Sequence, residues 1–157
     1  HGFFSYIFDH TTGFLHNWYS YVQDLRNILA ALSARYHGYE IEHQLVGYNE
    51  VTDKLRNSKS YDFNLGFDFP YIDLFIKLHE QKDYLELEKQ IDFIRWTKVE
   101  ELTQYAYFDF DAVAGYVIKF SITDKWAKHN TEKGHMLFLS KINQMGQSIK
   151  FSKEFEV

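Results

Sequence analysis

The chain has 157 residues, a formal net charge of −5 and no cysteine, so disulfides and thiolate chemistry are excluded. Its lysines and arginines form no cluster, which disfavours a nucleic-acid partner because phosphate binding depends on clustered positive charge. No run approaches the roughly 18 apolar residues of a membrane-spanning helix. Aromatic residues make up 19% of the chain against a single proline, a composition that suits packed helices.

The most regular stretch of the sequence lies between Leu15 and Tyr36. Apolar residues recur there at alternating spacings of three and four, which predicts one face of a helix. They are Leu15, Trp18, Val22, Leu25, Leu29, Leu32 and Tyr36. Gly38 follows, and glycine often ends a helix in the left-handed conformation. We expect this helix to be the centre of the fold, and its polar residues are candidates for specific contacts at an interface: Asp24, Arg26, Asn27 and Arg35.

Several other segments are predicted to be helical. Asn49 is expected to cap a short helix over residues 50–57, and Asp83 to cap a long one that starts at Tyr84 and ends near Tyr105. Phe69 and Pro70 are expected to begin a helix between these two, because proline is tolerated in a first helical turn. Further helices are expected at residues 3–8 and at residues 111–128, and the second of these is expected to be largely buried. A last helix is expected in the segment that carries Met136, Leu139, Ile142 and Ile149.

No segment alternates apolar and polar residues long enough to predict a strand. We therefore predict an all-α fold, a single helical bundle of about six to seven helices around one long central helix. Residues 1–157 are expected to form one helical domain, because no linker or low-complexity tract divides them. The first residue is His1 rather than methionine, so we expect the chain to be the C-terminal part of a longer protein.

Two Glu-x-x-His stretches, Glu40 to His43 and Glu132 to His135, give the best indication of a metal site. A carboxylate and an imidazole three residues apart on a helix form half of a di-iron site. Glu40 lies in a glycine-flanked loop, however, and His135 follows Gly134 in the first turn of its predicted helix. We therefore predict no metal and no cofactor. The alternative is a helical metal-dependent enzyme or ligand-binding bundle that uses these four residues.

The long charged segment after Asp83 contains a possible ion pair. Asp92 and Arg95 are three residues apart beside Trp96, which permits a local pair on one helix face. An exposed pair would contribute a few tenths of a kcal/mol, whereas a pair buried between helices opposite Asp24 or Arg26 would be costly to break. Trp18, Trp96 and Trp126 are interpreted as core or half-core residues. No nucleophile elbow and no phosphate-binding loop occurs, so no enzymatic activity is expected.

The segment Trp18 to Gly38, WYSYVQDLRNILAALSARYHG, resembles a bacterial family of unknown function whose genes lie among those for V-type ATPases. The resemblance continues in order through most of the chain. It includes VGYNEVTDKLRNSKSYDFNL from Val46, FPYIDLF from Phe69, the run from Ile91 to Phe120, and TDKW near Trp126.

A more distant similarity links residues 24–32 to the C subunit of V/A-type ATPases, which is called the d subunit in eukaryotes. Those relatives carry Asn-Leu-Lys-x-Ile-Leu-x-Ala-Lys there, and this chain keeps the apolar residues but has Asp24 and Leu32 at the two ends. The resemblance implies a helical fold like that of the C subunit, and a non-catalytic coupling subunit or accessory protein. Its expected partners are the central stalk and the membrane rotor ring. The expected location is cytoplasmic, peripheral to the inner membrane, with membrane contact only through protein partners.

Overall fold

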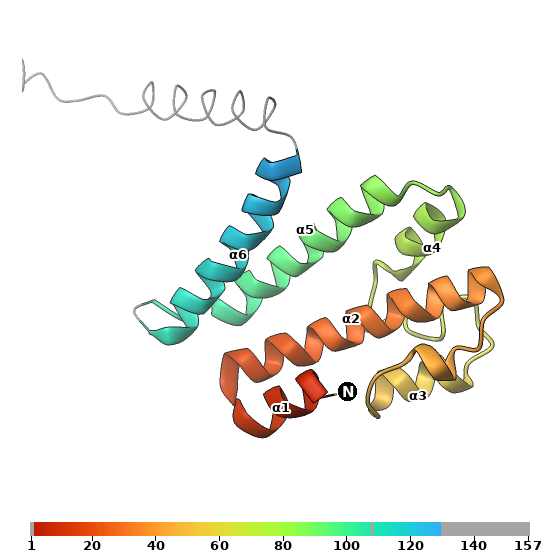
Figure 1. Cartoon of the computed structure of the whole chain (residues 1–157), viewed down its shortest axis with the longest axis horizontal. Helices are drawn as coiled ribbons and strands as arrows, with labels where there is room; N and C mark the ends of the chain where they lie inside the picture. The colour runs from red at the N-terminus through yellow and green to blue at the C-terminus, as the bar shows by residue number, and fades with distance from the viewer. Residues whose placement is uncertain (1, 108, 130–157) are drawn as a thin grey trace, which may run out of the picture. The chain divides into compact units, whose positions relative to one another are not determined.

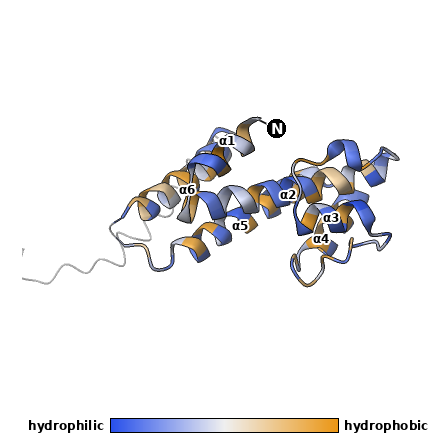
Figure 2. Ribbon diagram, turned by 90° about the horizontal axis from the view of Figure 1, so that it is seen from below, coloured by the Kyte–Doolittle hydropathy of each residue, from blue (hydrophilic) through white to orange (hydrophobic). Residues whose placement is uncertain are grey.

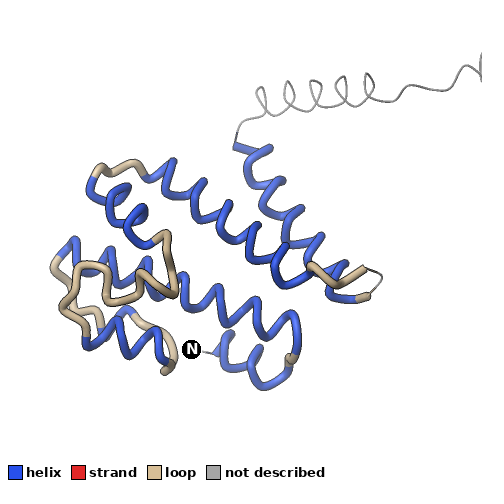
Figure 3. The backbone as a smooth tube through the Cα atoms, turned by 180° about the vertical axis from the view of Figure 1, so that it is seen from behind, coloured by secondary structure: helices blue, strands red, loops and turns tan. Residues whose placement is uncertain are grey.

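In the computed structural model, residues 2–107 and 109–129 are described, and all of their regular elements are helical (Figure 1, Figure 3). The all-α prediction is confirmed for these residues. None of the described helices has both the length and the apolar character that crossing a bilayer requires. The elements are α1 (Gly2–His10), α2 (Gly13–His37), the 3-10 turn η1 (Glu42–Gln44), α3 (Glu50–Asn57), α4 (Ile72–Glu80), α5 (Tyr84–Thr103) and α6 (Phe110–His129).

The chain divides into two compact units, His1–Gly115 and Tyr116–Val157, and helix α6 crosses the boundary between them. The first unit contains every helix from α1 to α5. The predicted last helix, with Met136, Leu139, Ile142 and Ile149, lies outside the described residues. One helical domain over the whole chain, and its place at the C-terminal end of a longer protein, stay predictions.

Helix α2 is the centre of the first unit, as predicted. It contacts α1, η1, α3, α4 and α5 (Figure 1). The helix ends where expected, because Gly38 takes a left-handed conformation with φ of 72° and the N–H of Tyr39 donates to the carbonyl of Ala34 at 2.8 Å. Hydrophilic residues are interspersed with hydrophobic ones along its ribbon (Figure 2), as in a helix that is partly covered and partly exposed to solvent.

The buried side of α2 is broader than the predicted row of residues. Leu25, Ile28 and Ala31 are almost fully enclosed, whereas Leu15, Val22 and Leu29 are half-buried and Tyr36 is exposed. The reason is that neighbours approach α2 from several directions, so no single row faces the core. The spacing of three and four located the helix correctly and its most buried side only in part.

Helices α3 and α5 begin at the predicted caps. The Asn49 side chain accepts the Thr52 N–H at 2.9 Å, and the Thr52 hydroxyl accepts the Asn49 N–H at 2.8 Å, which completes a capping box. Asp83 accepts the N–H of Glu86 at 3.1 Å. Helix α4 starts at Ile72, slightly later than expected, because the residues before it form a turn.

The core of the first unit draws on a loop as well as on helices. Phe63, Leu65 and Phe69 belong to the connection between α3 and α4 and are buried together with residues of α2, α4 and α5. Phe63 has a positive φ of 55°, so its backbone is held in a conformation that non-glycine residues seldom adopt. The core therefore includes a segment that the sequence identifies only as loop.

Helix α6 corrects one expectation. The prediction that it is largely buried is wrong, because Val113, Val117 and Phe120 are 62%, 57% and 59% exposed. Of residues 110–128, Gly115 and Ile122 are the buried ones. Apolar residues lie all around this helix, and hydropathy alone does not tell which of them a neighbour covers.

Candidate functional site

Asn27, in the middle of α2, binds the backbone of the loop that follows η1. Its Nδ2 donates to the carbonyl of Val46 and its Oδ1 accepts the N–H of the same residue, both at 2.9 Å. Asp24 lies one turn earlier and accepts a hydrogen bond from Nδ2 of Asn49 at 2.6 Å. Burial raises the pKa of the Asp24 carboxyl, and the hydrogen bond from Asn49 partly offsets this.

Arg35, near the C-terminal end of α2, holds a second loop. Its Nη1 donates to the carbonyl oxygens of Ser60 and Tyr61 at 2.7 and 2.8 Å. The guanidinium also lies 3.5 Å from the centre of the Phe63 ring, which places a cation against a buried aromatic face. Burial lowers the pKa of this guanidinium.

Arg26 is exposed on α2, and its guanidinium lies 5.7 Å from the centre of the Phe4 ring of α1. The four polar residues predicted for specific contacts therefore touch three segments of their own unit: α1, the loop of residues 46–49 and the loop of residues 60–63. These contacts position loops that have little regular hydrogen bonding of their own. A contact of the same four residues with a partner stays a prediction.

The predicted pair of Asp92 and Arg95 is present on α5 and faces α2. Asp92 is 3% exposed, and its Oδ1 lies 3.2 Å from Arg95 Nη1. The Arg95 guanidinium lies 5.8 Å from the Trp18 ring centre, and one turn further on Lys98 Nζ lies 5.3 Å from that of Tyr21. Such contacts contribute about 0.5–1 kcal/mol each at exposed sites. Two basic residues of α5 thus lie against two aromatic residues of α2.

Trp96, next to Arg95 on α5, donates from its Nε1 to Glu100 Oε1 at 2.9 Å on the same helix. Asp24 contacts Asn49, and Arg26 lies beside the Phe4 ring. Trp18 is buried, and Trp96 and Trp126 are half-buried, so the interpretation of the tryptophans as core or half-core residues is confirmed.

Tyr21 also takes part in a half-buried pair of phenols. Its hydroxyl lies 2.6 Å from the hydroxyl of Tyr71, just before α4. Burial is the main reason why the pKa of each phenol is raised. The pair joins α2 to the start of α4 by a hydrogen bond. Sequence spacing gave no sign of this pair, because its members are far apart in the chain.

The metal-binding alternative receives no geometric support from the described residues. Glu40 Oε2 and His43 Nε2 lie 3.0 Å apart, and both side chains are largely exposed. Glu132 and His135 lie outside the described residues. Within residues 2–107 and 109–129, no group of three or more histidine, aspartate or glutamate side chains is placed to hold a metal ion.

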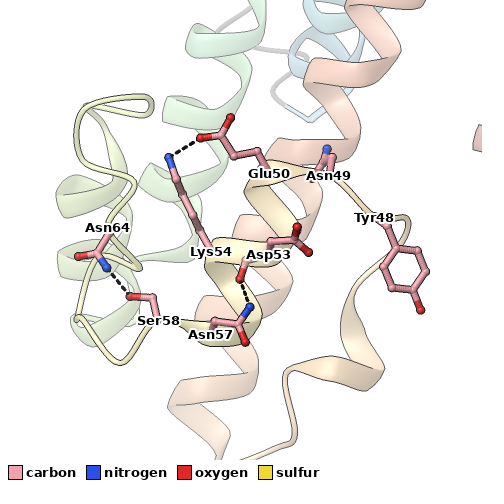
Figure 4. Close-up of a pocket in the computed structure, with 8 residues that line it drawn as sticks. All are labelled: Tyr48, Asn49, Glu50, Asp53, Lys54, Asn57, Ser58 and Asn64. Carbon is pink, nitrogen blue, oxygen red and sulfur yellow. Dashed lines mark hydrogen bonds and ion pairs between the residues drawn. The ribbon is translucent and has the colours of Figure 1, made fainter.

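A polar depression of about 640 Å³ lies over α3 (Figure 4). Its charged groups pair with one another and with neighbouring residues: Lys54 Nζ is 3.1 Å from Glu50 and 2.7 Å from Asp68, and the bond to Asp68 raises the pKa of the ammonium. Asn64 donates to the Ser58 hydroxyl at 2.9 Å. Through these contacts, the charged and polar side chains of the depression connect α3 with the loop after it.

Several large exposed apolar side chains lie together just after α5. Tyr105, Tyr107, Phe110 and Val113 are between 62% and 82% exposed, and we call these four residues the aromatic segment. From residue 99 to residue 118 the chain has four acidic residues, Glu100, Glu101, Asp109 and Asp111, and no lysine or arginine. Large exposed apolar side chains on a folded surface are typical of protein contacts.

Sequence comparison gives the family. A family model described as "Protein of unknown function (DUF2764)" matches residues 1–149. The chain belongs to this family. The expectation of a family of unknown function is thus confirmed, and no curated protein and no solved structure matches the chain. The description of DUF2764 assigns no activity to its members.

Proposed function

We propose that this DUF2764 protein is a non-catalytic coupling subunit, or an accessory protein, of a bacterial V/A-type ATPase. In this role it would link the central stalk to the membrane rotor ring, on the cytoplasmic side and peripheral to the inner membrane. The proposal rests on the resemblance of residues 18–38 to a family encoded with V-type ATPase genes, and on the more distant similarity of residues 24–32 to the C subunit of these ATPases.

The aromatic segment is the structural observation that supports a role in binding a protein partner. Its exposed rings and Val113 combine apolar area with nearby carboxylates, including Asp109 and Asp111. A partner surface with apolar pockets and a basic rim would complement both properties. The core of the first unit is packed from four helices and a loop, which suits a part that transmits force by contact.

The test is affinity purification of a tagged chain from membranes of the native organism, at low salt because polar contacts weaken as ionic strength rises. We expect stalk or ring subunits of the ATPase to be recovered in a fixed ratio. A variant with Tyr105→Ser, Tyr107→Ser and Phe110→Ser is expected to lose them. Phe67→Ser is the matched control, because Phe67 is 97% exposed and lies outside the aromatic segment.

Two results would contradict the proposal. One is a wild-type chain that is purified without any ATPase subunit. The other is a gene deletion that leaves ATP-driven ion transport and the assembly of the complex unchanged. If subunits bind but the triple variant retains them, the ATPase partner stands and the aromatic segment is not the contact.

A further inference from the structure

Helix α6 carries a row of exposed apolar side chains along one side. Phe110, Val113, Val117 and Phe120 are between 57% and 65% exposed, and we call these four residues the α6 seam. Their spacings of three, four and three residues are those by which two helices pack against each other. At about 100° per residue, the four side chains lie within one quarter of the circumference of the helix.

The opposite side of α6 faces the protein. Gly115 and Ile122 are the buried residues among positions 110–128, and both lie about half a turn around the helix from the α6 seam. Gly115 packs against the end of α5, where a Cβ on it would lie 2.8 Å from the Thr103 methyl group. The packing that buries Gly115 therefore leaves the α6 seam exposed.

The α6 seam reads the same in both directions along the helix. A phenylalanine stands at each end and a valine at each inner position, and the spacing is symmetric about residue 115. When two such helices run antiparallel, Phe110 of one copy meets Phe120 of the other. In the same register, Val113 meets Val117. A two-fold dimer requires a self-complementary surface of this kind.

The charges along α6 favour the same arrangement. From residue 99 to residue 118 the chain carries four carboxylates and no lysine or arginine, whereas residues 119–129 contain Lys119, Lys125 and Lys128 against Asp124 alone. An antiparallel pair brings the acidic start of each helix beside the basic half of the other. A parallel pair would place like charges together. Complementary charge selects the partner and its orientation.

We propose that the α6 seam binds the same seam of a second copy of this chain, so that two α6 helices pack antiparallel in a two-fold dimer. The phenylalanines form the two ends of the contact and the valines its centre. Tyr116 borders the contact, because its ring stacks with that of Phe120 at 6.5 Å between ring centres. Phe110 and Val113 also belong to the aromatic segment, so the dimer and the proposed ATPase contact would exclude each other.

Sedimentation velocity of the 157-residue chain, from about 5 to about 500 µM, tests for the dimer. We expect a monomer–dimer equilibrium within this range. Phe120→Ser should weaken the association about tenfold or more, because it removes one ring at each end of the contact. Phe93→Ser is the matched control, since Phe93 is 65% exposed on α5 and lies outside the α6 seam. Val117→Ser replaces Phe120→Ser if that variant does not fold, as judged by circular dichroism.

The direction of the two helices is measured separately with a spin label. The chain has no cysteine, so Ala127→Cys provides a single position for a nitroxide. Ala127 is exposed on α6, twelve residues after the centre of the α6 seam at residue 115. In the antiparallel dimer, the two labels lie about 36 Å apart along the helix axis. A parallel pair would bring them within about 20 Å, and pulsed electron–electron resonance distinguishes the two distances.

Four results overturn the proposal. The wild type stays monomeric at every concentration; or Phe120→Ser and Val117→Ser associate as strongly as the wild type; or Phe93→Ser weakens the association as much as Phe120→Ser; or the label distance is that of a parallel pair. The changes at Phe120, Val117 and Ala127 lie outside the aromatic segment, so each of these results leaves the ATPase partner to its own test.

Discussion

Single polar side chains on α2 hold the loops of the first unit in place. Asn27 binds the backbone of Val46, and Arg35 binds the backbone of Ser60 and Tyr61. A loop beside a helix has backbone groups without regular partners, and buried groups of this kind are costly to leave unpaired. The polar residues of α2 therefore determine where the loops lie.

Asn27→Ala should destabilise the first unit by about 2–4 kcal/mol, because it removes both hydrogen bonds that the buried Asn27 side chain makes with the half-buried backbone of Val46. Urea unfolding followed by circular dichroism measures the change. Asn57→Ala is the control: its side chain donates to the Asp53 carbonyl at the exposed end of α3, and we expect an effect below about 0.5 kcal/mol. Equal losses in the two variants would show that Asn27 is not a buried anchor.

Asp24 gives a prediction about pH. Burial raises its folded-state pKa above the usual value of 3.8. Between the unfolded-state pKa of about 3.8 and the raised folded-state pKa, the folded state binds more protons than the unfolded state. The contribution of Asp24 to stability therefore falls as pH rises through this window. Asp24→Asn keeps an acceptor for Asn49 and carries no charge. It should be more stable than the wild type at pH 7, with the advantage shrinking as pH is lowered towards 3.8.

Unfolding curves collected from about pH 3.5 to pH 7 on both proteins check this prediction. Asp73→Asn is a suitable control, because Asp73 is an exposed carboxylate in the first turn of α4. A wild type that gains stability relative to Asp24→Asn as pH rises would contradict the predicted sign.

Local signals in the sequence locate several helix ends. Asn49, Asp83 and Gly38 mark them correctly, since capping depends on one side chain or one backbone conformation and on residues within about one turn. The contact between two helices has no such signal. Gly115, near the start of α6, faces Val99 and Thr103 at the end of α5, and a Cβ there would lie 2.8 Å from the Thr103 methyl group.

Gly115→Ala should therefore destabilise the protein by an amount that depends on the side chain of Thr103. Overpacking by the added methyl group should cost about 1–3 kcal/mol of stability. Alanine is the better helix former, which should return roughly 1 kcal/mol. Thr103→Ser removes the opposing methyl group and keeps the hydroxyl that donates to Val99. In a double-mutant cycle, Gly115→Ala should cost about 1 kcal/mol less in the Thr103→Ser variant than in the wild type. Strictly additive effects would mean that the two residues do not touch.

At the scale of the whole first unit, a core shared by α2, α3, α4, α5 and the loop before α4 holds the segments together. Leu25 is 2% exposed within it. Leu25→Ala should cost about 2–5 kcal/mol, through lost transfer free energy and the cavity left behind. Leu29→Ala should cost less stability, since Leu29 is half-buried and part of its surface is already in water.

Chemical denaturation with guanidinium chloride measures these losses. Leu85→Ala provides the comparison, because Leu85 is exposed on the first turn of α5 and should change stability by less than about 0.5 kcal/mol. A change below that size for Leu25→Ala would show that α2 is not the centre of the unit.

The sequence by itself determined the helical class, the span of α2 and the caps of α3 and α5. These features depend on periodicity and on neighbours within a turn or so, which a sequence displays directly. It also drew attention to Asn27, Arg35 and Asp92 as polar residues of predicted helices, though not to what Asn27 and Arg35 touch.

The tertiary structure decided which partners those residues have. Asn27 meets Val46, Arg35 meets Ser60, and Tyr21 meets Tyr71, and each pair is separated by 19 to 50 residues. It also decided that Val113, Val117 and Phe120 are exposed on α6. Periodicity predicts that a helix has an apolar side. Which side is covered depends on residues distant in the chain, and only the folded backbone brings these together.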